Sequence, residues 1–243
     1  MPSVRGVSTA CAATLPLAVL LTGCVSTQTV AARARLVDAR IIASQTGTEV
    51  TRANPAVSAG TPVVIRNRTG SAIVVALRNE SARALTDLPI SVGVRMRSGR
   101  EFYLNRSANL DYFASHVAAI GPHAATAWVF TTGTSIPSGR PFVNVGFSQL
   151  HPTPTGSLPP VEVSLRASSG GVSLELSVVN RSAIPQYDLP VYAIALRAGR
   201  EVAAGRTAVA HLGTRGTTTS TISLLGSSRY DALRLIASPT IFS

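Results

Sequence analysis

Residues able to do chemistry are few in this chain, and they are not spaced for a shared site. The four histidines, His116, His123, His151 and His211, do not stand at a metal-ligand spacing such as His-x-x-x-His from another histidine, a cysteine or a carboxylate. The eleven acidic residues are dispersed singly, and no Gly-x-Ser-x-Gly nucleophile motif occurs. We therefore expect a protein that is not an enzyme and that uses no cofactor or metal, although a triad built from distant residues would leave no such motif.

Cys24 ends a segment that is typical of exported proteins. Arg5 gives a basic start, and residues 12–21 form an apolar run that only Thr14 and Pro16 interrupt. A basic start, a short apolar run and small residues at the cleavage point describe a secretory signal peptide. The run is shorter than the roughly 20 apolar residues that span a bilayer, which argues against a transmembrane anchor.

The tetrad Leu21-Thr22-Gly23-Cys24 resembles the lipobox of bacterial lipoproteins. The resemblance implies that residues 1–23 are removed and that Cys24 is acylated with palmitate-type chains and becomes the first residue. It implies a lipid-anchored protein at the extracytoplasmic face of the cell membrane. Plain secretory cleavage is the alternative, and it would leave Cys24 as a free thiol. Cys11, the only other cysteine, is lost with the signal, so the mature chain has no disulfide.

The chain is strongly basic, with 22 basic residues against 11 acidic ones and a net charge of +11. All the basic residues are arginines, and a basic surface near a membrane attracts anionic lipids and polymers. The arginines occur in small groups, as in Arg95/Arg97/Arg100, rather than in one run. Because aromatic residues make up only 5% of the chain, we expect no dedicated nucleic-acid site.

Residues 24–35 form a polar tether of small side chains, and β-type sequence begins at residue 36. Short β-branched runs at residues 62–65, 72–77, 90–96 and 172–179 alternate with Gly, Pro, Asn and Ser. Residues 172–178 alternate apolar and polar side chains, as a strand with one buried face does. This pattern predicts an all-β protein built from sandwiches.

An internal repeat predicts the domain organisation. The matching strings are Asn79-Glu80-Ser81 with Asn180-Arg181-Ser182, Asp87-Leu88-Pro89 with Asp188-Leu189-Pro190, and residues 97–101 with residues 197–201. We interpret residues 36–149 as a first β-sandwich domain with insertions and residues 161–243 as a second one. Residues 150–160 form a Pro-rich linker, and such a segment is extended enough to keep the two copies apart.

The order of strand, Asn-x-Ser turn, Asp-Leu-Pro, strand and Gly turn resembles the FxLYD-like family of immunoglobulin-like domains. The resemblance covers residues 161–242 and, more loosely, residues 36–149. No Phe-x-Leu-Tyr-Asp string occurs, and Tyr187-Asp188-Leu189 is the nearest fragment. The resemblance implies two tandem immunoglobulin-like β-sandwich domains in a bacterial envelope lipoprotein of actinobacterial type. It transfers no catalytic residues.

An insertion in the first copy, residues 105–114, carries the best candidates for a binding surface. Tyr103, Arg106, Tyr112 and Phe113 lie in it or beside it. Exposed aromatic side chains together with arginine are typical of the residues that dominate binding energy at interfaces. We predict that these four residues form a binding surface.

The signal, the tandem copies and the scarcity of catalytic motifs predict a membrane-anchored, non-catalytic module that binds or scaffolds another envelope protein. In the alternative, the arginine surface binds an anionic cell-wall polymer or lipid by electrostatic attraction.

Overall fold

The computed structural model describes residues 50–107, 110–148 and 157–240, all within one compact unit of residues 39–243. The lipobox residues Leu21, Thr22, Gly23 and Cys24 lie outside these ranges, as do the tether (residues 24–35) and residues 150–156 of the linker. The described residues form antiparallel strands and one short 3-10 turn, so the prediction of an all-β fold is confirmed. No helix among them is long and apolar enough to cross a membrane.

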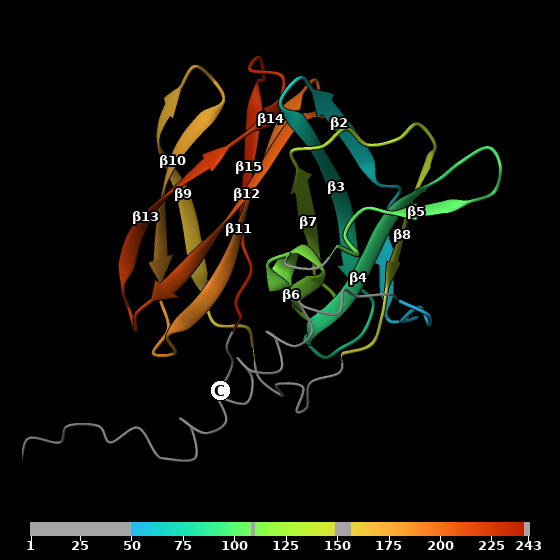
Figure 1. Ribbon diagram of the computed structural model, residues 1–243. Coiled ribbons are helices and arrows are strands. Elements are labelled where there is room, and N and C mark those ends of the chain that lie inside the picture. The colour runs from blue at the N-terminus through green and yellow to red at the C-terminus, as the bar shows by residue number, and fades with distance from the viewer. Residues whose placement is uncertain (1–49, 108–109, 149–156, 241–243) are drawn as a thin grey trace, which may run out of the picture. The chain divides into compact units, whose positions relative to one another are not determined.

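The first copy is blue to yellow-green in Figure 1 and the second is orange to red. The first copy contains β1 (Val57–Ala59), β2 (Val63–Asn67), β3 (Gly70–Asn79), β4 (Leu85–Arg95), β5 (Glu101–Tyr103), η1 (Tyr112–Ala114), β6 (His116–Ile120), β7 (Ala125–Thr132) and β8 (Arg140–Val145). The second contains β9 (Val161–Ser169), β10 (Ser173–Asn180), β11 (Gln186–Arg197), β12 (Arg200–Leu212), β13 (Thr217–Ser223), β14 (Leu225–Gly226) and β15 (Ala232–Ala237).

Each copy is a sandwich of two antiparallel sheets. In the first copy, β3 pairs with β1, β2 and β7 in one sheet, and β4 pairs with β5, β6 and β8 in the other. In the second copy the sheets have the orders β13-β10-β9 and β14-β12-β11-β15. The prediction of two tandem β-sandwich domains is therefore confirmed.

Asn79 and Asn180 form the same turn in the two copies. The side-chain oxygen of each accepts hydrogen bonds from the backbone N–H and the hydroxyl of the serine two residues on, at 2.9 and 2.7 Å in both cases. Each side-chain amide also donates to the backbone carbonyl of an equivalent glycine, Gly121 at 2.9 Å and Gly213 at 3.0 Å. The repeated Asn-x-Ser strings are therefore turns, each with a buried asparagine, at which β3 and β10 end.

Each copy has an apolar core, and Trp128 lies at the centre of the first. Trp128 is fully buried, and its indole N–H donates to the carbonyl of Phe113 at 3.0 Å. In the second copy, the alternation along β10 buries Leu174, Leu176 and Val178.

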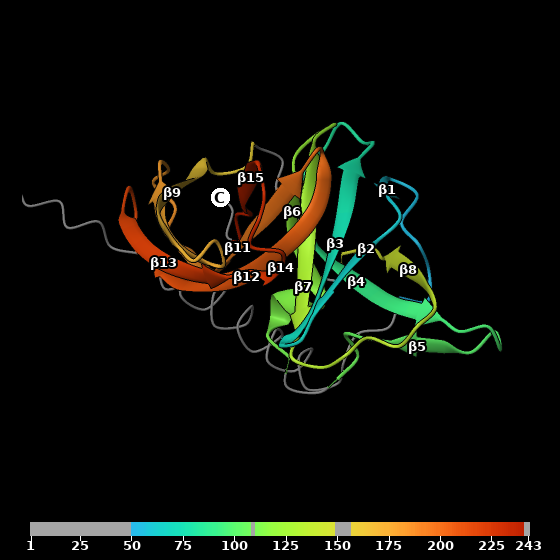
Figure 2. The same ribbon diagram turned by 90° about the horizontal axis from the view of Figure 1, so that it is seen from above.

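The two copies contact each other through β12, which lies against β3 and β7 (Figure 2). Tyr192, Ile194 and Ala204 of the second copy belong to the core cluster of the first. The prediction that the copies stay apart is therefore wrong. The reason is that β11 is buried on both faces, with Val191 and Ala193 directed to its own core and Tyr192 and Ile194 to the neighbouring one.

Candidate functional site

The structure divides the four predicted surface residues into two pairs. Tyr103 is partly exposed, and the guanidinium of Arg106 lies 5.9 Å from the centre of its ring. Phe113 is only 1% exposed, so the prediction that it belongs to a binding surface is wrong. It lies in η1, which buries its side chain, and its backbone carbonyl accepts the hydrogen bond from the indole of Trp128.

Tyr112 is half-buried and packs on the residues around it. Its ring stacks on the ring of His116 at 4.0 Å and meets Phe113 edge-on at 5.1 Å. The Nδ1 atom of His116 lies 3.1 Å from the Ser115 hydroxyl and 3.2 Å from the Tyr112 carbonyl. We therefore assign Tyr112, with Phe113, to the packing of η1.

The register of β5, β4 and β8 brings Tyr103 together with residues that are distant in the sequence. Glu101, Arg95 and Arg140 lie directly opposite one another across the three strands and form a charged row. Tyr103, Gly93 and Phe142 form an aromatic row beside it. We call this surface the arginine–aromatic face, and its members are Arg95, Glu101, Tyr103, Arg106, Arg140 and Phe142.

Gly93 allows the two aromatic rings to meet. A Cβ at this position would lie 2.5 Å from Cζ of Phe142, so the Phe142 ring occupies the space above the glycine. From there it meets the Tyr103 ring edge-on, with 5.4 Å between ring centres and an angle of 87°. Edge-to-face contact is a favoured geometry for aromatic pairs, and it holds both rings on a fixed strand framework.

The charged row is neutralised on one side only. The Arg95 guanidinium donates to one Glu101 oxygen at 2.6 Å, and the Tyr103 hydroxyl donates to the other at 3.1 Å. These hydrogen bonds lower the pKa of Glu101 below its ordinary value. The bond from Arg95 has the larger effect and the bond from Tyr103 the smaller. On the other side Arg95 stands opposite Arg140, and like charges in such a cross-strand pair repel.

Two grooves flank this like-charge pair. The larger, which we call the arginine groove, has a volume of about 740 Å³ and is lined by Arg95, Met96, Arg97, Ser138, Gly139 and Arg140. The smaller has a volume of about 300 Å³ and shares Arg95 and Arg140 with it, with Phe142 in its wall. The arrangement can bind anionic groups and aromatic or apolar side chains next to one another.

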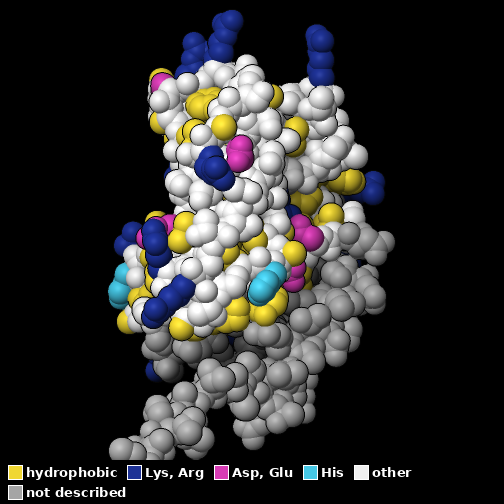
Figure 3. All heavy atoms as spheres, turned by 90° about the vertical axis from the view of Figure 1, so that its left-hand side faces the viewer, with side chains coloured by type: hydrophobic (Ala, Val, Ile, Leu, Met, Phe, Trp, Pro, Cys, Tyr) yellow, Lys and Arg dark blue, Asp and Glu magenta, His cyan; other side chains and the backbone are white. Residues whose placement is uncertain are grey.

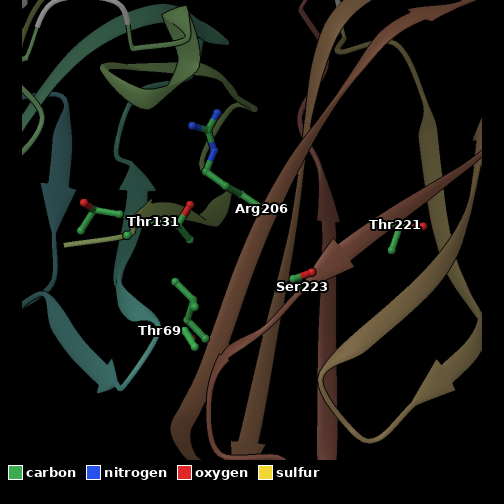
Figure 4. Close-up of a pocket in the computed structure, with 8 residues that line it drawn as sticks. Thr69, Thr131, Arg206, Thr221 and Ser223 are labelled. Carbon is green, nitrogen blue, oxygen red and sulfur yellow. The ribbon is translucent and has the colours of Figure 1, made fainter. Parts of the chain in front are cut away.

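A third groove, of about 390 Å³, is lined by residues from both copies (Figure 4). Thr69, Thr131 and Thr132 contribute hydroxyls from the first copy, and Thr221 and Ser223 from the second. Arg206 projects from β12 at its edge, but its guanidinium is held by Asp111 at 2.7 Å. This groove therefore offers neutral hydrogen-bonding groups.

Figure 3 views the side formed by β9, β10 and β13, where basic side chains project from a largely uncharged surface and several lie near one another at the lower left. Two arginines of these strands and the turn after β10 are paired with carboxylates, Arg166 with Glu175 at 3.7 Å and Arg181 with Glu162 at 2.9 Å. Among the described residues of the whole chain, no three His, Cys, Asp or Glu side chains are grouped closely enough to hold a metal ion.

Sequence reasoning missed Arg140 and Phe142 as members of the face. Their positions depend on the pairing of β8 with β4, across more than forty residues of chain. The available signal was the string Gly139-Arg140-Pro141-Phe142, a glycine turn followed by a short apolar run with an arginine at its start.

Comparisons with known proteins add little to this geometry. The sequence matches no protein-family model and no curated protein. Among solved structures, the chain is similar to red sea bream transglutaminase at 12% sequence identity, with a TM-score of 0.22 over 80% of this chain. The similarity covers 32% of the transglutaminase chain, just under a third of its length.

Proposed function

We propose that this chain is a lipid-anchored envelope lipoprotein that acts as a non-catalytic module and binds another envelope protein on the arginine–aromatic face. The observation that carries the proposal is the contact of Tyr103 with Phe142 over Gly93, with arginines on both sides. Tyrosine and arginine are enriched among the residues that dominate binding energy, and partly buried rings lose little conformational freedom on binding.

The proposed lipid anchor is attached at Cys24, the last residue of the lipobox. A single acyl chain gives only marginal membrane binding, so stable attachment requires the additional acyl chains that the resemblance implies. Cys24→Ala is expected to move the protein from the membrane fraction to the soluble fraction. Retention of this variant in the membrane would contradict the anchor.

The binding proposal is tested by isolating the full lipoprotein from cells and washing it with high salt. We expect a discrete protein partner to survive the wash, because contact with buried aromatic rings is not screened by ions. Phe142→Ala should lose this partner. Phe147→Ala is the matched control, since Phe147 is 42% exposed with Arg52 at 5.2 Å but lies outside the face. Equal loss in both variants would reject the face as the docking surface.

The like-charge pair Arg95–Arg140 favours a second candidate function, in which the chain binds an anionic wall polymer or lipid. Such binding is driven by counterion release and falls steeply as salt rises. Material that is recovered at low salt and lost at high salt would support this candidate over a protein partner.

A further inference from the structure

Because the two copies share one fold, the end of β4 and β8 that lines the arginine groove can be compared with the equivalent end of β11 and β15. We call this end of the paired strands the corner. Ile90 pairs with Val145 in the first copy and Val191 with Ala237 in the second, so β8 and β15 are equivalent strands. Continuing along these strands, the pair Arg95–Arg140 corresponds to the pair Leu196–Ala232. The same fold therefore closes this corner with two apolar residues in one copy and with two arginines in the other.

The second copy also places a carboxylate at this corner. Asp231 precedes Ala232, and its side chain accepts a hydrogen bond from the Ala198 N–H at 2.8 Å. The equivalent residue in the first copy is Gly139, which has no side chain, and a Cβ there would lie 2.8 Å from the Arg95 carbonyl. The first copy thus has Arg95 and Arg140 where the second has Leu196 and Ala232, so the fold does not require arginines at these two positions. Arg97 differs, because the repeat matches it with Arg197.

Among the described residues, two guanidinium groups in the groove have no carboxylate partner. Arg95 is paired with Glu101, at 2.6 Å. Within the described part of the chain, Arg97 and Arg140 form no ion pair with any carboxylate. Both line the same groove, together with the exposed hydroxyl of Ser138 and the half-buried side chain of Met96.

We propose that the arginine groove is a binding site for a phosphate monoester group, held between Arg97 and Arg140. A phosphate monoester carries a charge of about −1.5 to −2 at neutral pH, which matches two uncompensated arginines, whereas one carboxylate would compensate only one of them. The planar guanidinium groups suit phosphate oxygens, with two parallel hydrogen bonds from each. Ser138 adds a neutral donor. The site deepens the second candidate function and rests on it, because it names the anionic group that would be recognised.

The test is a titration of the purified full chain with inorganic phosphate at constant ionic strength, followed by NMR of the arginine side chains. We expect saturable shifts at Arg97 and Arg140, and a dissociation constant about tenfold or more higher in Arg97→Gln/Arg140→Gln, because charge-assisted hydrogen bonds are lost. The matched control is Arg197→Gln/Arg200→Gln, which removes the same charge from the hairpin of the second copy and should leave binding unchanged.

Equal weakening in both double variants, or shifts spread over all arginines without saturation, would overturn the proposal. The groove variant should fold, since it removes a like-charge contact, and the heat-unfolding midpoint checks this. Glycerol 3-phosphate and micelles containing phosphatidic acid then distinguish a soluble ester from a lipid headgroup. If glycerol 3-phosphate or phosphatidic acid binds more tightly than inorganic phosphate, the result supports the site. If both fail to bind, the proposal is overturned. Failure of these titrations would leave the protein-docking proposal standing, because that proposal depends on Phe142 and is read out at high salt.

Discussion

Asp111 of the first copy and Arg206 of the second form a doubly hydrogen-bonded ion pair, with oxygen–nitrogen distances of 2.7 and 2.9 Å. The Arg206 side chain is only 8% exposed, whereas that of Asp111 is 52% exposed. The insertion that the sequence suggested as a binding loop therefore attaches the first copy to β12 of the second. Its aromatic residues pack within the first copy, Tyr112 on the ring of His116 and Phe113 in the core.

Asp111→Asn should destabilise the protein, because it leaves the buried guanidinium of Arg206 without its counter-charge. We expect the free energy of unfolding to fall by about 1–3 kcal/mol in urea denaturation at neutral pH. Glu162→Gln is the control, because it breaks a pair with Arg181 in which both side chains are largely exposed, and its effect should be far smaller. Equal effects would show that the Asp111–Arg206 pair does not hold the copies together.

Tyr192→Phe should stabilise the protein. The Tyr192 ring is 2% exposed, and its hydroxyl has no hydrogen-bond partner among the described residues. Burial raises the pKa of Tyr192 above its ordinary value of 10.0, so the hydroxyl is neutral at pH 7 and stays so well into the alkaline range. Removing a buried, unsatisfied hydroxyl should raise the free energy of unfolding by about 1 kcal/mol. A lower melting temperature in this variant would show that the hydroxyl makes a hydrogen bond that stabilises the fold.

Gly93→Ala should disrupt the arginine–aromatic face. The added methyl group would collide with the Phe142 ring and with the Phe102 carbonyl, and overpacking of this kind costs about 1–3 kcal/mol. The NMR signals of Tyr103 should shift, because the Phe142 ring must move away. Gly133→Ala is the matched control, since a Cβ there meets nothing within 4 Å. Unchanged Tyr103 signals in Gly93→Ala would contradict the ring arrangement.

Glu101 should titrate below its ordinary pKa of 4.5, because hydrogen bonds from Arg95 and Tyr103 favour the carboxylate. A lowered pKa in the folded protein means that the stabilisation is present above the ordinary value and is lost as the pH falls through the lowered one. NMR of the Glu101 carboxyl should show its titration midpoint moving to higher pH in Arg95→Gln. Arg97→Gln removes the same charge without touching the Glu101 hydrogen bonds and should move it much less. An unchanged midpoint in Arg95→Gln would remove Arg95 as the cause.

Local patterns in the sequence were sufficient to predict an all-β fold, the two Asn-x-Ser turns and individual strands such as β10. The alternation in residues 172–178 corresponds to β10, and the repeated Asn79 and Asn180 make equivalent hydrogen bonds. Each asparagine side chain hydrogen-bonds to the serine two residues on and to backbone carbonyls close to the turn and in one neighbouring loop. A short string is therefore enough to specify such a turn.

Contacts across strands and between copies could not be predicted in the same way. The meeting of Tyr103 with Phe142 and of Arg95 with Arg140 depends on the register of β8, which is set by packing of the whole sheet. The sequence indicated the packing of one copy against the other only weakly. Residues 191–195 are uninterrupted by charge, as in a strand buried on both faces, and Tyr192 and Ile194 are the residues that use the second face.

The most direct test of the proposed function is a photoreactive amino acid placed at Tyr103 of the full chain in living cells. Amine-reactive crosslinkers find no side chain to modify here, because the chain contains no lysine. We expect a single discrete protein to be crosslinked from position 103 and not from position 147, where the exposed Phe147 lies outside the face. No protein crosslinked from position 103, or the same proteins from both positions, would contradict docking on the arginine–aromatic face.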